Sequence, residues 1–320
     1  MYRIGIDLGG TNIAAAVVND EFKIVKKLSV PTLAQRDAAL IMDDMAQLCR
    51  DVCREAGIAI EDIDAIGIAS PGVANHDTGA VEYACNLPFR KFPICRELSD
   101  RLGVNNIHVE NDANAAAWGE AVAGAAKGTK NSVMITLGTG VGGGIIIDGK
   151  VYSGFNYAGA ELGHIVIQVG GKPCGCGRRG CWEAYSSATG LVNMTRDKLE
   201  ECAKSGRKTI MPDIVDKYGK VNGRIAFEAA KAGDEAAQEV VDEYALYLES
   251  GLTSIINIFQ PEVLSIGGGI SGEGQSLVDL VFPTIDHERY GGGFVDKATE
   301  IRIAELGNDA GIIGAAFLGI

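Results

Sequence analysis

Short apolar stretches recur along the chain, and several of them run directly into glycine-rich turns. Hydrophobic runs of about four to eight residues, alternating or continuous, are typical of β-strands. The first three runs, with a glycine turn after the first, predict an antiparallel start to the fold. The predicted strands are Tyr2–Asp7, Ile13–Val18, Ile24–Ser29, Ile63–Ala69, Ile107–Glu110, Ser132–Leu137, Gly144–Ile147, Val263–Ile266 and Ile301–Ala304.

Longer segments between these strands carry hydrophobic residues at the helical spacing. Gly57 and Pro261 are stop signals directly after two of them, and Pro212-Asp213 separates two further helical stretches that follow residue 183. We expect the last helix to pack back on the first half of the chain. The predicted helices are Ala38–Ala56, Glu97–Leu102, Ala113–Ala126, Asp234–Phe259 and Ala310–Leu318.

The two halves of the chain open alike, each with an apolar strand, a glycine turn and another apolar strand. The stretch DLGGTN at Asp7–Asn12 is echoed by LGTGVGGG at Leu137–Gly144. Strands that alternate with helices predict a mixed α/β fold, and 320 residues are enough for two domains. The repeat of motifs predicts two related halves.

The charge balance narrows the choice of partners. The formal net charge is −13, which argues against nucleic acid or an anionic membrane as a partner. No apolar stretch is as long as a transmembrane helix, and the N-terminus has no signal-peptide layout. Five of the eight cysteines are scattered without a disulfide framework, which fits a reducing cytoplasm.

One segment, residues 161–183, concentrates possible metal ligands in ELGHIVIQVGGKPCGCGRRGCWE. Three thiols and one imidazole suit tetrahedral Zn²⁺, and four protein ligands leave no open position, as in a structural site. The C-x-C-x4-C spacing differs from the C-x2-C pairs of zinc fingers. The alternative is three reduced cysteines in a glycine-rich loop. The predicted zinc ligands are His164, Cys174, Cys176 and Cys181.

Two carboxylates flank these ligands. Glu161 precedes His164 by three residues, and Glu183 follows Cys181 by two. A metal-bound histidine has a second ring nitrogen, which usually donates to a neighbouring oxygen. Such an N–H group between two carboxylates could recognise hydroxyl groups. The residues alone leave open whether both glutamates are simply solvated loop charges.

Three glycine-rich turns each follow an apolar strand, at Gly9-Gly10, Gly138–Gly144 and Gly267–Gly269. Backbone N–H groups in such turns can hold an anion because no Cβ atom blocks the approach. None is a P-loop. Three turns spread over two similar halves, with hydroxyls at Thr11 and Thr139, predict a bound nucleotide, and Asp7 at a strand end is placed for Mg²⁺.

These motifs together resemble the ROK family of sugar kinases, within the actin/hexokinase/Hsp70 superfamily. The matching stretches cover nearly the whole chain in the expected order, and the cysteine segment is specific to this family within the superfamily. They are DLGGTN at Asp7–Asn12, SPG at Ser70–Gly72, END at Glu110–Asp112, LGTGVGGG at Leu137–Gly144, ELGH at Glu161–His164, CGCGRRGCWE at Cys174–Glu183 and IGGG at Ile266–Gly269.

The resemblance implies an α/β fold of two actin-like (ribonuclease H-like) ATPase domains, with a cleft between them and a zinc-binding loop. The smaller domain would hold residues 1–118 and 306–320, because the last helix packs back. The larger would hold residues 119–305, with the zinc segment at 161–183. By itself, Asp112 would be interpreted as the N-cap of the helix that follows it. The resemblance makes it the catalytic base instead.

The resemblance also implies the other site residues and the zinc ligands already named. The sugar would be bound by Gly72, Asn111, Asp112, Glu161, His164 and Glu183. The nucleotide and its Mg²⁺ would be bound by Asp7, Gly9, Gly10, Thr11, Asn12, Thr139, Gly140, Gly268 and Gly269. Arg178-Arg179 and Trp182 depart from the residues expected at their positions, between a zinc ligand and a sugar ligand.

The implied activity is ATP-dependent phosphorylation of a hexose, with glucose as the first choice and structural Zn²⁺ beside Mg²⁺-ATP. The alternatives are a kinase for fructose, mannose or an N-acetylhexosamine, and a non-catalytic sugar sensor of the same family. Sugar-responsive repressors of the family carry a DNA-binding segment ahead of the kinase-like part, whereas here the first strand begins at Tyr2. The resemblance also implies a cytoplasmic homodimer or homotetramer.

Overall fold

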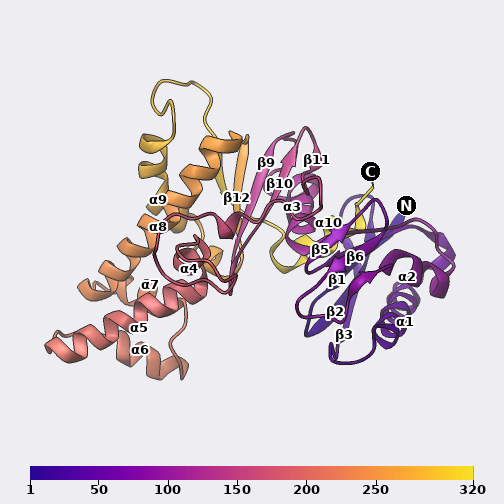
Figure 1. Ribbon diagram of the computed structural model, residues 1–320, viewed down its shortest axis with the longest axis horizontal. Coiled ribbons are helices and arrows are strands. Elements are labelled where there is room, and N and C mark those ends of the chain that lie inside the picture. The colour runs from indigo at the N-terminus through magenta and orange to yellow at the C-terminus, as the bar shows by residue number, and fades with distance from the viewer. Residues whose placement is uncertain (320) are drawn as a thin grey trace. The chain divides into compact units, whose positions relative to one another are not determined.

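The computed structural model describes residues 1–319, and its chain divides into two compact units (Figure 1). The first unit holds residues 1–134 and 143–160 together with the chain from Ala304 onward, and the second holds residues 135–142 and 161–303. Residues 119–134 and 143–160 therefore belong to the same compact unit as the N-terminal part of the chain. The domain boundaries inferred from the sequence, 118/119 and 305/306, describe functional domains and stay a prediction.

The first unit is built on a five-stranded sheet with the order β3-β2-β1-β4-β8. The first three strands pair antiparallel, as the sequence predicts, whereas β1 with β4 and β4 with β8 are parallel. The strands of this sheet are β1 (Tyr2–Leu8), β2 (Asn12–Asn19), β3 (Ile24–Pro31), β4 (Ile63–Ser70) and β8 (Ile107–Asn111).

Helices cover both faces of this sheet. Successive side chains of a strand point to opposite faces, and β2 shows this clearly. Ala15 and Val17 belong to the core formed with α1 (Ala38–Ala56) and α2 (Ile94–Leu102). Ala16 and Val18 pack instead with α10 (Ala310–Ala316), so the last helix does return to the first half of the chain, as predicted (Figure 1).

Local signals set the ends of α1 where the sequence predicts them. The Asp37 carboxylate accepts a hydrogen bond from the N–H of Ala39 at 2.9 Å, which caps the first turn. Gly57 then takes a left-handed conformation at φ 71°, which a residue with a Cβ atom rarely adopts. The apolar face between these caps packs on the sheet.

The approach of α10 to its neighbours depends on glycines. A Cβ atom on Gly5 would lie 1.9 Å from the carbonyl oxygen of Ile312, and one on Gly67 would lie 1.7 Å from that of Ala315. From the helix side, a Cβ atom on Gly314 would lie 1.7 Å from the oxygen of Ala115, in α3 (Asp112–Ala123). The sheet, α10 and α3 are therefore in contact backbone to backbone.

A second five-stranded sheet has the order β11-β10-β9-β12-β13. Position by position it repeats the first sheet: β9 and β10 take the places of β1 and β2, and β12 and β13 those of β4 and β8. The duplication that the two glycine turns predict is thus present in the topology. The strands are β9 (Ser132–Leu137), β10 (Val141–Ile147), β11 (Lys150–Val151), β12 (Val263–Gly267) and β13 (Glu300–Ile303).

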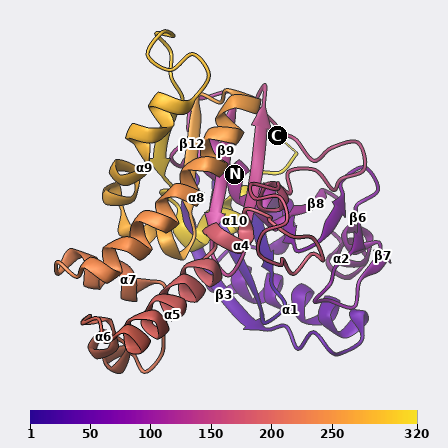
Figure 2. The ribbon, with the colours of Figure 1, turned by 60° about the vertical axis from the view of Figure 1, so that its left-hand side comes forward.

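The second unit is rich in helices, and α8 packs against α5, α7 and α9 (Figure 2). Within residues 1–319, no helix is both long enough and apolar enough to cross a bilayer. The helices of this unit are α4 (Glu183–Ser186), α5 (Ala188–Ser205), α6 (Met211–Tyr218), α7 (Arg224–Lys231), α8 (Glu235–Phe259) and α9 (Gln275–Glu288).

Some elements lie outside the sequence expectations. Pro212 does not separate two helices but sits in the first turn of α6, where its missing N–H costs nothing. Helix α9 contains Pro283 and was not predicted. A three-stranded sheet of short strands was also missed, and consists of β5 (Val73–Asn75), β6 (Ala80–Tyr83) and β7 (Arg90–Phe92).

Gly314→Ala is expected to destabilise the protein by at least about 1–3 kcal/mol, because the added methyl group meets backbone that cannot yield. Gly311→Ala, in the same helix, is the matched control. A Cβ atom there meets nothing within 4 Å, and alanine favours the helix by up to about 1 kcal/mol. Thermal unfolding of the two variants measures the difference, and equal melting temperatures would contradict the backbone contact.

Candidate functional site

The turn from β8 into α3 presents Asn111 and Asp112. Asn111 is the N-cap of α3, since its Oδ1 accepts hydrogen bonds from the N–H groups of Ala113 and Asn114. Its amide Nδ2 donates to the carbonyl oxygen of Gly72 at 3.1 Å, so these two predicted sugar ligands lie together. The capping role that the sequence alone would give to Asp112 therefore belongs to Asn111.

Asp112 is exposed to solvent at the first position of α3. Desolvation by the surrounding protein raises the pKa of its carboxyl above the ordinary value, although hydrogen bonds from the N–H of Ala113 and from its own N–H oppose the shift. Burial, and then the charge of Asp112, raise the pKa of Asp7, which places these two acidic groups in one electrostatic environment.

The first glycine turn is stabilised by a hydrogen bond within the turn and by two hydrogen bonds from Thr32. The N–H of Gly9 donates to the carbonyl oxygen of Asn12 at 2.9 Å. Thr32, which is fully buried, donates its hydroxyl to the oxygen of Gly9 at 2.6 Å and its N–H to the oxygen of Thr11 at 2.8 Å. No sequence signal pointed to Thr32, because it meets the turn only through the pairing of β2 with β3.

The second glycine turn belongs to the second unit and is supported by the start of α5. The hydroxyl of Thr189 donates to the carbonyl oxygen of Thr139 at 2.7 Å. A Cβ atom on Gly140 would lie 2.3 Å from Oε2 of Glu183, so a larger residue would displace that carboxylate from its present position. The same oxygen accepts from the N–H of Val141 at 3.1 Å. The structure thus joins a predicted phosphate turn to a predicted sugar ligand.

The third glycine turn lies against the second. Gly268 has φ 84°, and a Cβ atom on it would lie 2.6 Å from the backbone of Leu137. Gly269 lines a cavity of about 330 Å³ that also includes Asn222, Gly223 and Arg224. These three residues precede or begin α7 and were not predicted as site residues. A pocket next to this turn could hold a nucleoside.

The four predicted zinc ligands come together. His164, Cys174, Cys176 and Cys181 have ligand atoms that all lie within 4.8 Å of one another. Nδ1 of His164 is 3.7 Å from the Cys174 sulfur, and the sulfurs of Cys176 and Cys181 are 3.6 Å apart. Tetrahedral thiolates about 2.3 Å from Zn²⁺ would be separated by about 3.8 Å. The group fits a tetrahedral metal ion in both chemistry and spacing.

The residues that depart from the family pattern support this loop. The Arg178 guanidinium donates to the carbonyl oxygen of His164 at 3.2 Å, and that of Arg179 to the oxygen of Gly170 at 3.4 Å. Trp182 is fully buried, and its indole N–H donates to the oxygen of Tyr247 in α8. These side chains hold the metal-ligand segment in place.

The predicted site residues form one group in each unit. In the first unit lie Asp7, the turn Gly9–Asn12, Gly72, Asn111 and Asp112. In the second lie Thr139, Gly140, Gly268, Gly269, the four metal ligands and the two glutamates. Glu183 touches the metal group, with Oε1 at 3.4 Å from the Cys174 sulfur, whereas Glu161 is exposed one turn before His164.

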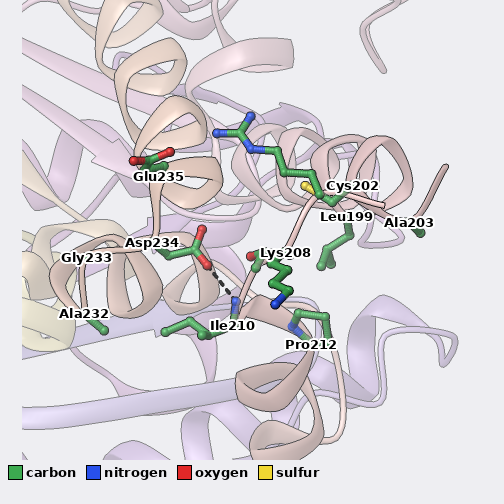
Figure 3. A pocket seen from close by; sticks show the side chains of 12 residues that line it. Leu199, Cys202, Ala203, Lys208, Ile210, Pro212, Ala232, Gly233, Asp234 and Glu235 are labelled. Carbon is green, nitrogen blue, oxygen red and sulfur yellow. Dashed lines mark hydrogen bonds between the residues drawn. The ribbon is translucent and has the colours of Figure 1, made fainter. Parts of the chain in front are cut away.

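A cavity of about 760 Å³ in the second unit contains none of these predicted residues (Figure 3). It is lined by the end of α5, the loop to α6 and the turn from α7 into α8. Two acidic residues, Asp234 and Glu235, line it. Asp234 is already occupied, because it caps α8 at the N–H of Ala237 and accepts from the N–H of Ile210 at 2.6 Å (Figure 3). We therefore assign this cavity no part in the site.

Known proteins resemble the chain over its whole length. The ROK family matches residues 3–320. A glucokinase of Halalkalibacterium halodurans is 39% identical over 99% of this chain and 94% of its own. A ROK family glucokinase from Streptomyces griseus, solved with glucose and AMPPNP, is 35% identical over 99% of both chains, with a TM-score of 0.79. On these matches the chain belongs to the ROK family.

Proposed function

We propose that this protein transfers the terminal phosphoryl group of ATP to glucose and so forms glucose 6-phosphate. The observation that carries the proposal is the exposed Asp112 carboxylate at the start of α3, whose capping role is already filled by Asn111. Although one oxygen of Asp112 accepts from the N–H of Ala113, the cap does not depend on it, so the carboxylate is available to take a proton. The full-length similarity to glucokinases, one of them solved with glucose and AMPPNP, supports the same reaction.

Asp112 is the proposed base. Phosphoryl transfer needs positioning and charge neutralisation more than covalent help from the protein. Asp112 would accept the proton of the attacking sugar hydroxyl and would orient that oxygen. Asp7, which shares its electrostatic environment, would hold Mg²⁺ directly or through water, and the bound ion would neutralise phosphate charge.

The nucleotide is proposed to be bound by the glycine turns. Backbone N–H groups of Gly9–Asn12, and of Thr139 and Gly140, would hold the phosphates. Gly268 and Gly269 would lie near the adenosine, and the cavity of about 330 Å³ next to Gly269 is large enough for part of a nucleoside.

The sugar ligands are proposed to include the metal ligand His164. Its Nδ1 faces the Cys174 sulfur, which leaves Nε2 free of the metal. Zn²⁺, when bound, would fix that ring and make Nε2 an N–H donor of constant direction. Glu161 and Glu183 would accept from sugar hydroxyls, as would the carbonyl oxygen of Gly72. The Oδ1 of Asn111 is taken up by the cap of α3, so Asn111 would donate to the sugar through its Nδ2. The zinc is structural in this scheme because four protein ligands complete its shell.

A kinase for fructose, mannose or an N-acetylhexosamine remains the alternative within the same reaction class, and a non-catalytic sugar sensor is the alternative outside it. A cytoplasmic location and a homodimer or homotetramer stay predictions.

A coupled assay with ATP over a set of common hexoses tests the substrate directly. Glucose is expected to give the highest kcat/KM, because the chain is similar to a glucokinase over nearly its whole length. A higher kcat/KM with another hexose would show that this hexose, and not glucose, is the preferred substrate. The assignment as a sugar kinase would be unaffected. Sugar binding without turnover on any hexose would favour the sensor.

Asp112→Asn is expected to lower kcat by about 10²–10⁴-fold, since it removes the base and keeps the shape of the side chain. The melting temperature should hardly change, because Asn111 supplies the cap of α3. In the wild type, kcat/KM should rise with pH through the pKa of Asp112, which lies above the ordinary carboxyl value. Wild-type turnover in the variant would remove Asp112 from this role.

Cys176→Ser is expected to lower zinc content, melting temperature and glucose affinity together, because the loop that carries Glu183 loses its metal. His164→Ala should retain part of the zinc through three thiolates and still lose about tenfold in glucose affinity. Cys85→Ser, at an exposed cysteine outside the group, is the control. Elemental analysis and calorimetry give the readouts. Zinc-free protein with full activity would contradict the metal site.

A further inference from the structure

A buried carboxylate precedes the catalytic turn and has no role in the scheme above. Glu110 is only 4% exposed. Its Oε1 accepts from the N–H of Asn111 at 2.8 Å and from the side-chain amide of Asn114 at 3.0 Å. Its Oε2 accepts from the hydroxyl of Ser153 at 3.1 Å and lies 3.4 Å from Nδ1 of His76. Both oxygens are therefore used.

These partners come from separate parts of the first unit. Asn111 belongs to the turn that carries Asp112, and Asn114 to the first turn of α3. His76 lies just after β5, and Ser153 lies two residues after β11. One carboxylate thus ties the catalytic turn and its helix to two loops that are distant in sequence.

The Ser153 side of this network leads to a predicted sugar ligand. Ser153 begins the segment 153–160, whose ends are joined by a hydrogen bond from the N–H of Gly159 to the Ser153 oxygen at 2.8 Å. Tyr157 anchors the segment further, because its ring packs edge-on against His76 at 4.9 Å and its hydroxyl donates to Asp77. The next residue after this segment is Glu161.

We propose that Glu110 is a positioning residue of the kinase: its carboxylate sets the Asn111–Asp112 turn and the segment 153–160 in one fixed arrangement. This inference rests on the proposed function. Glu110 acts through Asn111, Ser153 and His76 and does not itself contact the sugar.

The surroundings explain why hydrogen bonds, and not packing, fix the turn. Glu110, His76, His108 and Trp118 all line a cavity of about 270 Å³. Open space on that side leaves the carboxylate without tight van der Waals contact there. If the carboxylate is removed, the cavity gives water access to the N–H of Asn111, and the turn can shift. A displacement of about 1 Å at a reacting group can cost about 100-fold in rate.

The same helix offers a matched control. Glu120, in α3, is fully buried and is likewise held by N–H groups. Its Oε2 accepts from Ala125 at 2.7 Å and Glu305 at 3.1 Å, and its Oε1 accepts from Leu306 at 2.8 Å. Glu120 therefore ties the far end of α3 to the chain before α10. It has the same chemistry and burial as Glu110 but no link to the catalytic turn.

The experiment compares Glu110→Ala, Glu110→Gln and Glu120→Ala in the full chain. For each variant, kcat is calculated per folded molecule. Glu110→Ala is expected to lower kcat by about 100-fold and to raise the KM for glucose, while the KM for ATP stays unchanged. Glu110→Gln keeps the shape and an acceptor for Asn111, so it should recover to within about tenfold of the wild-type kcat. Glu120→Ala should lower the melting temperature without changing either KM or kcat per folded molecule.

The outcomes separate the inference from the function beneath it. If wild-type protein phosphorylates glucose and the Glu110 variants lose no more than Glu120→Ala, then Glu110 is only structural and the inference is overturned. A change in the KM for ATP as large as that for glucose would overturn it as well. Wild-type protein without kinase activity would overturn the proposed function, and the positioning role with it.

Discussion

The contact on which the first unit depends is the backbone approach between α10, the sheet and α3. A Cβ atom added to any of four glycines here would lie less than 2.5 Å from a backbone carbonyl oxygen. They are Gly5 and Gly67 in the sheet, and Gly119 and Gly314 in the helices. Bulky side chains would separate these layers by several ångströms, whereas glycines let the backbones touch. These contacts fix the middle of α3 at Ala115 and Gly119, and the turn at its start, with Asp112, is left to hydrogen bonds.

Three acidic residues near α3 show how environment decides what a carboxylate does. Glu120 is fully buried and accepts from the backbone N–H groups of Ala125, Glu305 and Leu306, so it ties the end of α3 to the chain before α10. Glu110 is buried as well, but two of its donors are side chains that the fold brings from distant loops. Asp112 is exposed and its helix is capped by its neighbour, so it is the one of these three carboxylates that is open to solvent. A buried carboxylate with all its acceptor sites filled stabilises structure, and an exposed one is available for chemistry.

The sequence predicted what local pattern controls. Helix Ala38–Ala56 has the predicted bounds because its caps are adjacent in sequence, and the metal group was found because its ligand types occur within one short segment. The strands β5, β6 and β7 are too short to show a clear alternation of hydrophobic and polar residues. Helix α9 was missed because Pro283 lies inside it, and proline usually indicates the end of a helix. The roles of Thr32, Ser153 and His76 could not be predicted, because each meets its partner across a large separation in sequence. Long-range hydrogen bonds leave no periodic trace.

Glu183 shows how a structural metal could take part in recognition. Its Oε2 is fixed by the N–H of Val141, in the strand that follows the second glycine turn, so the carboxylate has a constant orientation. Its Oε1 lies 3.4 Å from the Cys174 sulfur, which can donate to it only as a thiol. A thiolate bound to Zn²⁺ has no proton to give, so Oε1 would be left with an unfilled acceptor site close to His164. In the proposed function a sugar hydroxyl would supply the missing donor. The metal would then favour sugar binding at Glu183 without being a ligand of the sugar itself.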